Sequence, residues 1–281
     1  CRKAGFLSGR RQAVATGWQR ILTAAFLAAL PFASARSAQP AATPDFSGIW
    51  THPFWPGFDP PPSGPGPVTN RKRTRSGAGD GNQLVGDYTN PILKPEAAAK
   101  VRSHGDLSLS NKTYLTPANQ CWPQPVPYIL WTIDIQMIQT PGEVVILYSN
   151  PNHEVRHVRM NARHATPVTP SWYGDSIGHY EGDTLVIDTV GVKDDRPYAM
   201  ADVYGTPYSK SLHVVERYRL VDYETGQAGI ARAMKENFAI PSDDSGLILD
   251  KDYKGKALQL AFTVEDEIGR APSELQSRLH L

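Results

Sequence analysis

The feature that most constrains the fold is a series of short β-type segments that follow one another from about residue 131. In the first, residues 131–139, Ile133, Ile135 and Met137 alternate with polar residues, as on a half-buried strand. Similar segments cover residues 144–148, 153–160, 175–180, 184–190, 212–220, roughly 227–236 and 257–264, and residues 43–50 resemble a first strand. Tight turns separate them, so the sequence predicts a mainly β fold: an antiparallel meander closing as a barrel, with a β-sandwich as the alternative.

The rest of the chain predicts one short helix, one irregular insert and a leader. Pro95 and Glu96 suit the first turn of a helix over residues 90–102, and Gly105 follows it. Residues 51–90 are rich in Pro and Gly and predict an irregular insert.

The first 35 residues have the pattern of a secretory signal peptide. Arg10, Arg11 and Arg20 precede the apolar run 21–30, and the small residues Ala-Ser-Ala end at Ala35. Cleavage there would leave one domain, residues 36–281, in the periplasm or outside the cell. The run is too short to span a membrane, and an amphipathic N-terminal helix is the alternative.

Charge and motifs exclude several function classes. The formal net charge is +1, which gives no general attraction to nucleic acid or anionic lipid, and the basic residues 71–75 suit a solvated loop. No P-loop, no GxGxxG after a strand and no CxxC occurs. HEVRH at 153–157 fits the letters of HExxH, but that zinc motif needs a helix, and these residues are expected on a strand. Without the leader, Cys121 is the only cysteine, so we expect no intrachain disulfide and a buried structural thiol rather than a nucleophile.

Residues 174–178 match G-x-S-x-G, the pattern around the nucleophile of many serine hydrolases. That role needs an apolar strand, a sharp turn and then a helix. Here Pro167 and Pro170 precede the motif, and a glycine turn and a β-branched run follow it. The sequence therefore favours Ser176 as a strand residue of a hairpin.

The hairpin brings candidate catalytic groups to one face. If Gly182-Asp183 is the turn, His179 lies opposite Val186, and Asp188 is its diagonal neighbour. A carboxylate there would orient the imidazole as a general base, and Asp175 shares the face. A solvent-facing His–Asp pair is the alternative.

Glu216 is a further candidate because it shares its strand face with apolar residues. A carboxylate in such a place must be paired or protonated. It is either a catalytic group or half of a buried structural ion pair.

Two other residue groups could bind a metal or a ligand. His153, His157 and His164 could hold Zn²⁺, although two strand histidines four apart need a bulge to share one ion. No other cofactor is expected. The aromatic side chains Trp172, Tyr173 and Tyr180, together with Arg163, could line a ligand mouth, although a core or rim position is the alternative for the aromatics.

Three segments carry a resemblance to a known family. FSGIW (46–50), PSWYGDSIGHYEGDTLVIDTVG (170–191) and LHVVERYRLVD (212–222) resemble a group of exported bacterial proteins without an established activity. The resemblance spans roughly residues 43–266. The Gly-x-Trp at 48–50 is also similar to the lipocalin and calycin signature, which implies a calycin-like barrel. Residues 267–281 depart from the pattern, in which a further strand with an aromatic-Thr-x-Pro-Trp segment is expected.

These observations leave three functions open. The first is an exported hydrolase, an esterase or lactonase that attacks a small amphiphilic ester or lactone, such as an acyl-homoserine lactone, by general-base or metal-assisted activation of water. The second is a non-catalytic, lipocalin-like carrier of a small apolar ligand. The third is a structural envelope protein. The density of ionisable residues between 153 and 217 favours the hydrolase.

Overall fold

A computed structural model of the protein describes residues 43–52, 66–75, 77–131, 134–149, 153–236, 252–267 and 277–280. All of them belong to one unit, Ala41–Leu281. The predicted signal peptide and residues 53–65 of the predicted insert lie outside the described residues, so cleavage after Ala35 stays a prediction.

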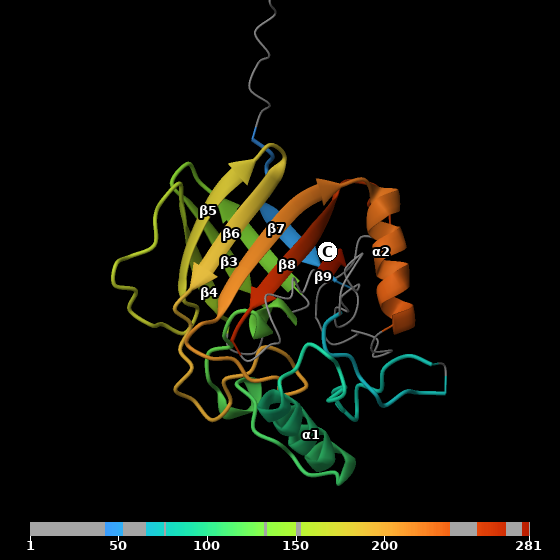
Figure 1. The fold of residues 1–281 in the computed structure, drawn as a ribbon. Helices are drawn as coiled ribbons and strands as arrows, with labels where there is room; N and C mark the ends of the chain where they lie inside the picture. The colour runs from blue at the N-terminus through green and yellow to red at the C-terminus, as the bar shows by residue number, and fades with distance from the viewer. Residues whose placement is uncertain are drawn as a thin grey trace, which may run out of the picture. The chain divides into compact units, whose positions relative to one another are not determined.

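The unit is built around one large sheet (Figure 1). Its strands are β1 (Gly48–Thr51), β2 (Asp134–Gln139), β3 (Glu143–Tyr148), β4 (Val155–Met160), β5 (Asp175–Glu181), β6 (Thr184–Val190), β7 (His213–Val221), β8 (Ala257–Glu265) and β9 (Ser277–His280). Alternating or β-branched sequence therefore predicted most strands to within a few residues. The predicted mainly β, barrel-like fold is confirmed.

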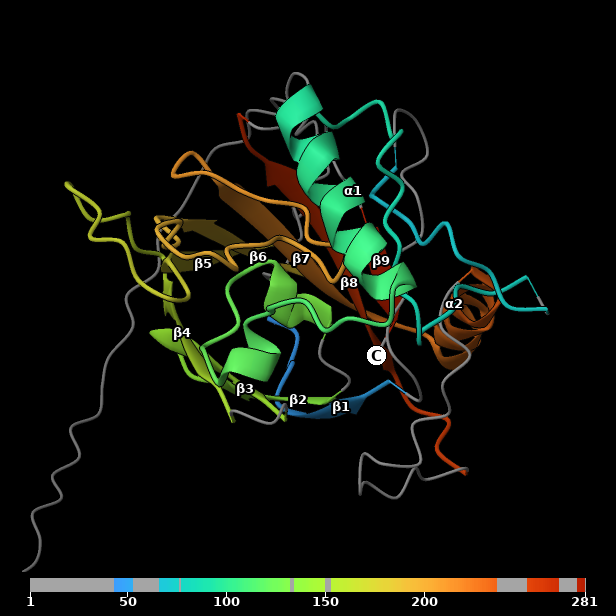
Figure 2. The ribbon, with the colours of Figure 1, turned by 90° about the horizontal axis from the view of Figure 1, so that it is seen from below.

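The nine strands lie side by side in sequence order and curve into a barrel that stays open between β1 and β9 (Figure 2). Neighbouring strands are antiparallel except β4 and β5, which pair in parallel through Arg159–Ile177 and Met160–Gly178. The long connection 161–174 carries the chain back to the end at which β4 began, which a parallel pair requires. The predicted all-antiparallel meander was wrong at this pair.

Turn chemistry sets the register of the β5–β6 hairpin as predicted. Glu181 lies opposite Thr184 and His179 opposite Val186, and Gly182 adopts a φ of 61°. At the other end of the sheet, β9 pairs with β8, so the C-terminal segment supplies a further strand although it lacks the expected aromatic-Thr-x-Pro-Trp segment.

Within the described residues two α-helices accompany the sheet, where one was predicted. Helix α1 (Pro95–Leu109) begins at the predicted proline but runs through Gly105 instead of ending there. A Cβ at Gly105 would lie 3.0 Å from Cγ1 of Val85, so this glycine allows close packing rather than stopping the helix.

Helix α2 (Tyr223–Glu236) occupies the segment for which we predicted a strand at 227–236. Asp222 caps it, because its carboxylate accepts a hydrogen bond from the amide of Thr225 at 2.7 Å. Gly226 lies against β8, where a Cβ would approach that of Ala257 to 2.4 Å. The strand prediction for residues 227–236 was wrong because it did not take the N-cap Asp222 into account.

Side chains fill the barrel interior. Apolar residues of β2 to β8 form the main core, among them Ile146, Leu185, Ile187 and Leu260. A second apolar cluster lies at one end, where α1, the 3₁₀ helices η1 (Ala118–Gln120) and η2 (Tyr128–Trp131) and the loop 191–212 cover the barrel (Figure 2). The loops of this end carry the hollow described below.

Candidate functional site

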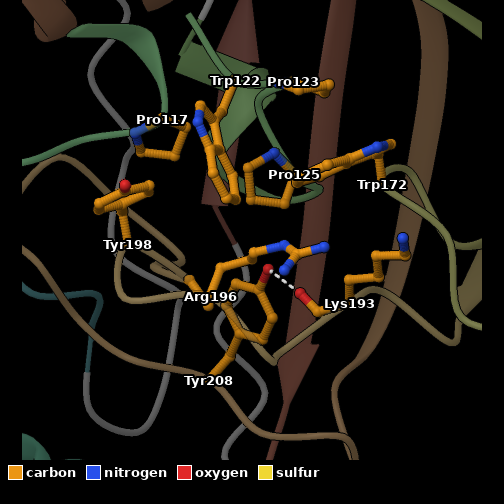
Figure 3. Close-up of a pocket in the computed structure, with 10 residues that line it drawn as sticks. Pro117, Trp122, Pro123, Pro125, Trp172, Lys193, Arg196, Tyr198 and Tyr208 are labelled. Atoms are coloured by element: carbon orange, nitrogen blue, oxygen red, sulfur yellow. Dashed lines mark hydrogen bonds between the residues drawn. The ribbon is translucent and has the colours of Figure 1, made fainter. Parts of the chain in front are cut away.

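A shallow hollow lies among the loops at the covered end of the barrel (Figure 3). Aromatic and proline rings make most of its wall, and two cations complete it; the lining residues are Pro117, Trp122, Pro123, Pro125, Trp172, Lys193, Arg196, Tyr198, Ala199 and Tyr208. Its wall encloses about 10 Å³, room for about one water molecule, and the rest of its space is open to solvent. We call it the aromatic hollow.

Three separate segments build the aromatic hollow. Residues 117–125 reach it from the connection after α1, Trp172 from the loop before β5, and residues 193–208 from the loop between β6 and β7. Backbone hydrogen bonds join the second and third segments, because the amide of Ser171 donates to Gly191 O and that of Lys193 donates to Ser171 O. The hydroxyl of Tyr208 donates to Lys193 O at 2.8 Å, which fixes the loop further.

The rings of the aromatic hollow meet edge to face. The centroid of Trp122 lies 5.3 Å from that of Trp172 and 5.0 Å from that of Tyr198, both nearly perpendicular. Such arrangements are favourable because a positive ring edge meets a negative ring face. The rings are therefore held in place without a ligand.

Two cations lie against these rings. The guanidinium carbon of Arg196 lies 5.0 Å from the centroid of Trp122 and 5.1 Å from that of Trp172, and Nζ of Lys193 lies 5.1 Å from Trp172. Nε of Arg196 is buried, and no hydrogen-bond partner for it occurs among the described residues; Asp195 Oδ1 lies 3.5 Å away. The hollow therefore offers positive charge and an unused donor beside aromatic surface.

A second polar group lies on the outer face of the sheet, towards the same end. Oδ1 of Asp188 lies 3.1 Å from Nε2 of His164 and 3.0 Å from Nε2 of His213. Beyond them, His164 Nδ1 contacts Asp175 at 3.3 Å and His213 Nδ1 contacts Glu265 at 3.2 Å. We call these five residues the histidine–carboxylate chain.

In this chain, the interaction between His213 and Asp188 favours the charged form of both side chains. The hydrogen bond to Asp188 raises the pKa of His213 to about 8, although partial burial opposes this, and His213 in turn lowers the pKa of Asp188. Burial raises the pKa of Asp175, but hydrogen bonds from the Ala165 amide and from Arg159 outweigh it, so that pKa is lowered. At neutral pH His213 is an imidazolium, a proton donor rather than a base.

His179 lies away from this chain, although its register was predicted correctly. Its side chain is exposed, and Nε2 lies 3.1 Å from Glu181 Oε1. The pairing predicted between His179 and Asp188 was wrong, because a loop residue and a residue of β7 occupy the carboxylate. Sequence spacing along one hairpin could not reveal either partner.

Glu216 lies inside the barrel as half of an ion pair with Arg156. The two guanidinium NH groups donate to its carboxylate at 3.0 and 2.7 Å, and the Tyr218 hydroxyl donates at 2.8 Å. Both charged side chains are almost completely buried. Ser176, on β5, accepts a hydrogen bond from Arg156 Nε at 3.1 Å and contacts Thr189, so it is the predicted strand residue. This arrangement matches the structural alternative for Glu216.

The three histidines predicted as zinc ligands have different surroundings. His153 lies before β4 with a φ of 50°, His157 contacts Glu143 at 2.7 Å, and His164 belongs to the histidine–carboxylate chain. No cluster of three or more His, Cys, Asp or Glu that could hold a metal occurs in the part of the chain that the structure describes.

The predicted ligand-contacting residues divide between hollow and core. Trp172 lines the aromatic hollow, whereas Tyr173 and Tyr180 pack against the main core, and Tyr180 also stacks on Phe46. Arg163 is exposed, and its carbonyl accepts a hydrogen bond from Arg159. Cys121 is exposed, so the predicted buried thiol was wrong.

Most of the groups that the fold gathers were not predicted from the sequence. Arg156, His213, Trp122, Lys193 and Arg196 were not candidates. The only available signals were the mixture of prolines and tryptophan at 117–125 and of charges and tyrosine at 193–198. Neither signal shows that the two segments meet.

Comparisons with protein-family models, with curated proteins and with solved structures found no match. Among the described residues, no helix has the length and apolar character needed to cross a membrane.

Proposed function

We propose that the protein is a non-catalytic binding protein that captures a small molecule in the aromatic hollow. The observation that carries the proposal is the wall of perpendicular aromatic rings beside Nε of Arg196, which is buried and has no hydrogen-bond partner among the described residues. Binding sites combine apolar and aromatic surface with a few well-placed polar groups, and this hollow has that composition.

The filled barrel supports an end-on site. Bulky side chains such as Arg156, Tyr218 and Ile146 occupy the interior, where a lipocalin-like carrier would hold its ligand. A ligand therefore meets the aromatic hollow at the covered end of the barrel. This is the predicted carrier function with its site moved from the lumen to the loops.

The test is binding of single-ring probes to the purified protein. Saturation-transfer NMR with benzoate, benzamide, benzyl alcohol and benzylamine should detect at least one binder. Trp122→Ala should weaken that binder about 10-fold or more, because the ring supplies contact area and stacking. The matched control is His179→Gln, an exposed residue of β5 that leaves the hollow intact. If no probe binds, or if Trp122→Ala changes nothing, the proposal fails.

A second candidate is the predicted hydrolase, with its active group moved to the histidine–carboxylate chain. The observation that favours it is His213 between Asp188 and Glu265, with a pKa raised to about 8 by the hydrogen bond to Asp188. Asp188 would accept a proton from the attacking water, and His213 would give its proton to the leaving alkoxide of an ester or lactone.

This candidate differs from general-base catalysis by His179 in its pH dependence. With His213 as the acid, hydrolysis of a p-nitrophenyl ester or an acyl-homoserine lactone should fall as the pH rises through about 8. His213→Gln should lower the rate about 10²-fold, whereas His179→Gln should leave it unchanged. A rate that instead falls on acidification, and that His179→Gln abolishes, would restore His179 as the base.

A further inference from the structure

We propose that the ligand of the aromatic hollow is a small aromatic carboxylate, whose ring packs among the indoles and whose carboxylate binds Arg196 and Lys193. The inference rests on the proposed binding function and adds the chemical class of the ligand.

The charge of the ligand follows from the polar groups that the hollow leaves unused. Arg196 Nε is buried and lacks a hydrogen-bond partner within the described residues, and Lys193 Nζ lies over Trp172. The hydroxyl of Tyr208, by contrast, already donates to Lys193 O. The unused groups are thus donors and cations, which an anionic acceptor complements.

The stacking of Arg196 leaves its donors available. A guanidinium that lies over indole rings uses its flat face for the cation–π contact, while its N–H groups point outward in the plane. Figure 3 shows this side chain extending across the hollow between the rings of Pro125 and Tyr208. A carboxylate, which is planar and has two acceptor oxygens, matches such a fork better than an ammonium or an amide does.

Asp194 and Asp195 supply negative charge close to the hollow, since burial and both carboxylates raise the pKa of the lining residue Tyr208, but Asp195 does not satisfy Arg196 Nε. Asp195 Oδ1 lies 3.5 Å from Arg196 Nε, at the limit of a hydrogen bond, and its side chain is 66% exposed. A surface ion pair of this kind contributes little free energy, so a bound carboxylate can replace it.

The size and shape of the ligand follow from the wall. Trp122, Trp172 and Tyr198 meet edge to face, which offers faces and edges to one further flat ring. The hollow is shallow and encloses little volume, so it can offer its wall to one face of a single ring but cannot take up a long acyl tail. Benzoate is therefore the probe of choice.

The decisive comparison is between benzoate and benzamide, which have nearly the same shape but differ in charge. We expect isothermal titration calorimetry at low ionic strength to give benzoate at least about 10-fold tighter binding in the wild-type protein. Arg196→Gln should abolish that preference, because it removes the counter-charge of the carboxylate, and Lys193→Gln should reduce it. The matched control is Arg217→Gln, which removes an exposed arginine that pairs with Glu181 on the outer face of the barrel.

Two further measurements keep the proposal testable if Arg196→Gln misfolds. In wild-type protein, the Nε–H resonance of Arg196 should shift on addition of benzoate and not of benzamide. Phenyl phosphate tests the class of anion, because two phosphate oxygens can also pair with a guanidinium; weaker binding than that of benzoate supports the carboxylate, and tighter binding would assign the site to phosphate esters.

The outcomes also separate this inference from the proposed function. Equal affinities for benzoate and benzamide, both lost in Trp122→Ala, would overturn the carboxylate class and leave a binding site for neutral rings. Absence of binding by every probe would overturn both.

Discussion

At the scale of single residues, His104 of α1 is a titratable side chain in a place that disfavours its charged form. It is buried, its ring centroid lies 3.5 Å from that of Tyr114, and neither ring nitrogen has a hydrogen-bond partner within the described residues. Burial lowers its pKa to about 4, because the charged form loses its hydration.

We predict that His104 makes the protein acid-sensitive. Its folded-state pKa is below the value of about 6.5 in the unfolded chain, so the unfolded state binds more protons between these pH values. The free energy of unfolding should fall as the pH drops from about 6.5 to about 4, by an amount on the order of 3 kcal/mol.

Urea unfolding at pH 7 and at pH 4.5 measures this loss. His104→Leu has a similar volume and cannot titrate, so its free energy of unfolding should change less between these two pH values. An equal loss in wild type and variant would show that other groups cause the acid sensitivity.

We predict that His213 has the opposite effect on stability: its contribution to the free energy of unfolding is lost as the pH rises. Its pKa in the folded protein is raised to about 8, mainly by the hydrogen bond to Asp188, so its stabilising effect is complete below about pH 6.5 and is lost as the pH rises through 8. Because the side chain is 34% exposed, solvent screening limits the effect to less than about 1 kcal/mol. Thermal unfolding of wild type and His213→Gln at pH 6.5 and 9 should converge at the higher pH. A constant difference would contradict the protonated pair.

At the scale of elements, contacts between helix and sheet decide what local sequence leaves open. Helix α2 lies against β8 through Gly226, where a Cβ would come within 2.4 Å of the Ala257 Cβ. Neither atom is on a flexible side-chain end, so the close approach depends on glycine.

We predict that Gly226→Ala destabilises the protein despite the higher helix propensity of alanine. The gain in propensity is about 1 kcal/mol, and the forced separation of α2 from β8 should cost about 1–3 kcal/mol. Gln227→Ala, at an exposed position in the same helix, is the control and should change the free energy of unfolding by less than about 0.5 kcal/mol. Chemical unfolding measures both variants; a stabilised Gly226→Ala would mean that α2 moves away from β8 without cost.

At the scale of the whole described unit, one buried network links five strands across the barrel interior. Arg156 on β4 contacts Tyr148 on β3, Ser176 on β5, Thr189 on β6 and Glu216 on β7. All three guanidinium nitrogens donate hydrogen bonds in this network. The network therefore fixes how the β2–β4 and β5–β8 parts of the barrel face each other.

We predict strong coupling between the two charges. Glu216→Leu alone should lower the free energy of unfolding by about 3–5 kcal/mol, because it leaves a buried guanidinium without its counter-charge. The double variant Arg156→Met/Glu216→Leu should lose much less than the sum of the single changes. A double-mutant cycle by urea unfolding measures this; additive losses would show that the pair does not act as a unit.

The sequence alone determined those features that depend on neighbours along the chain. Alternation and turn residues placed most strands and the β5–β6 register, and therefore the faces of Ser176 and His179. The alternation of residues 212–220 placed Glu216 on an apolar face. These succeed because the side-chain period of a strand is two and a short turn fixes its register. The same local reasoning failed at residues 227–236, where the Asp222 cap begins a helix.

Only the tertiary structure decided which side chains meet. Asp188 binds His164 from a loop and His213 from β7 rather than its hairpin neighbour His179, and Glu216 finds Arg156 across the barrel. The aromatic hollow joins residues from Pro117 to Tyr208. The physical reason is that strand periodicity sets the face of a residue, whereas its partners depend on sheet curvature and on the paths of long loops, which no short sequence window encodes.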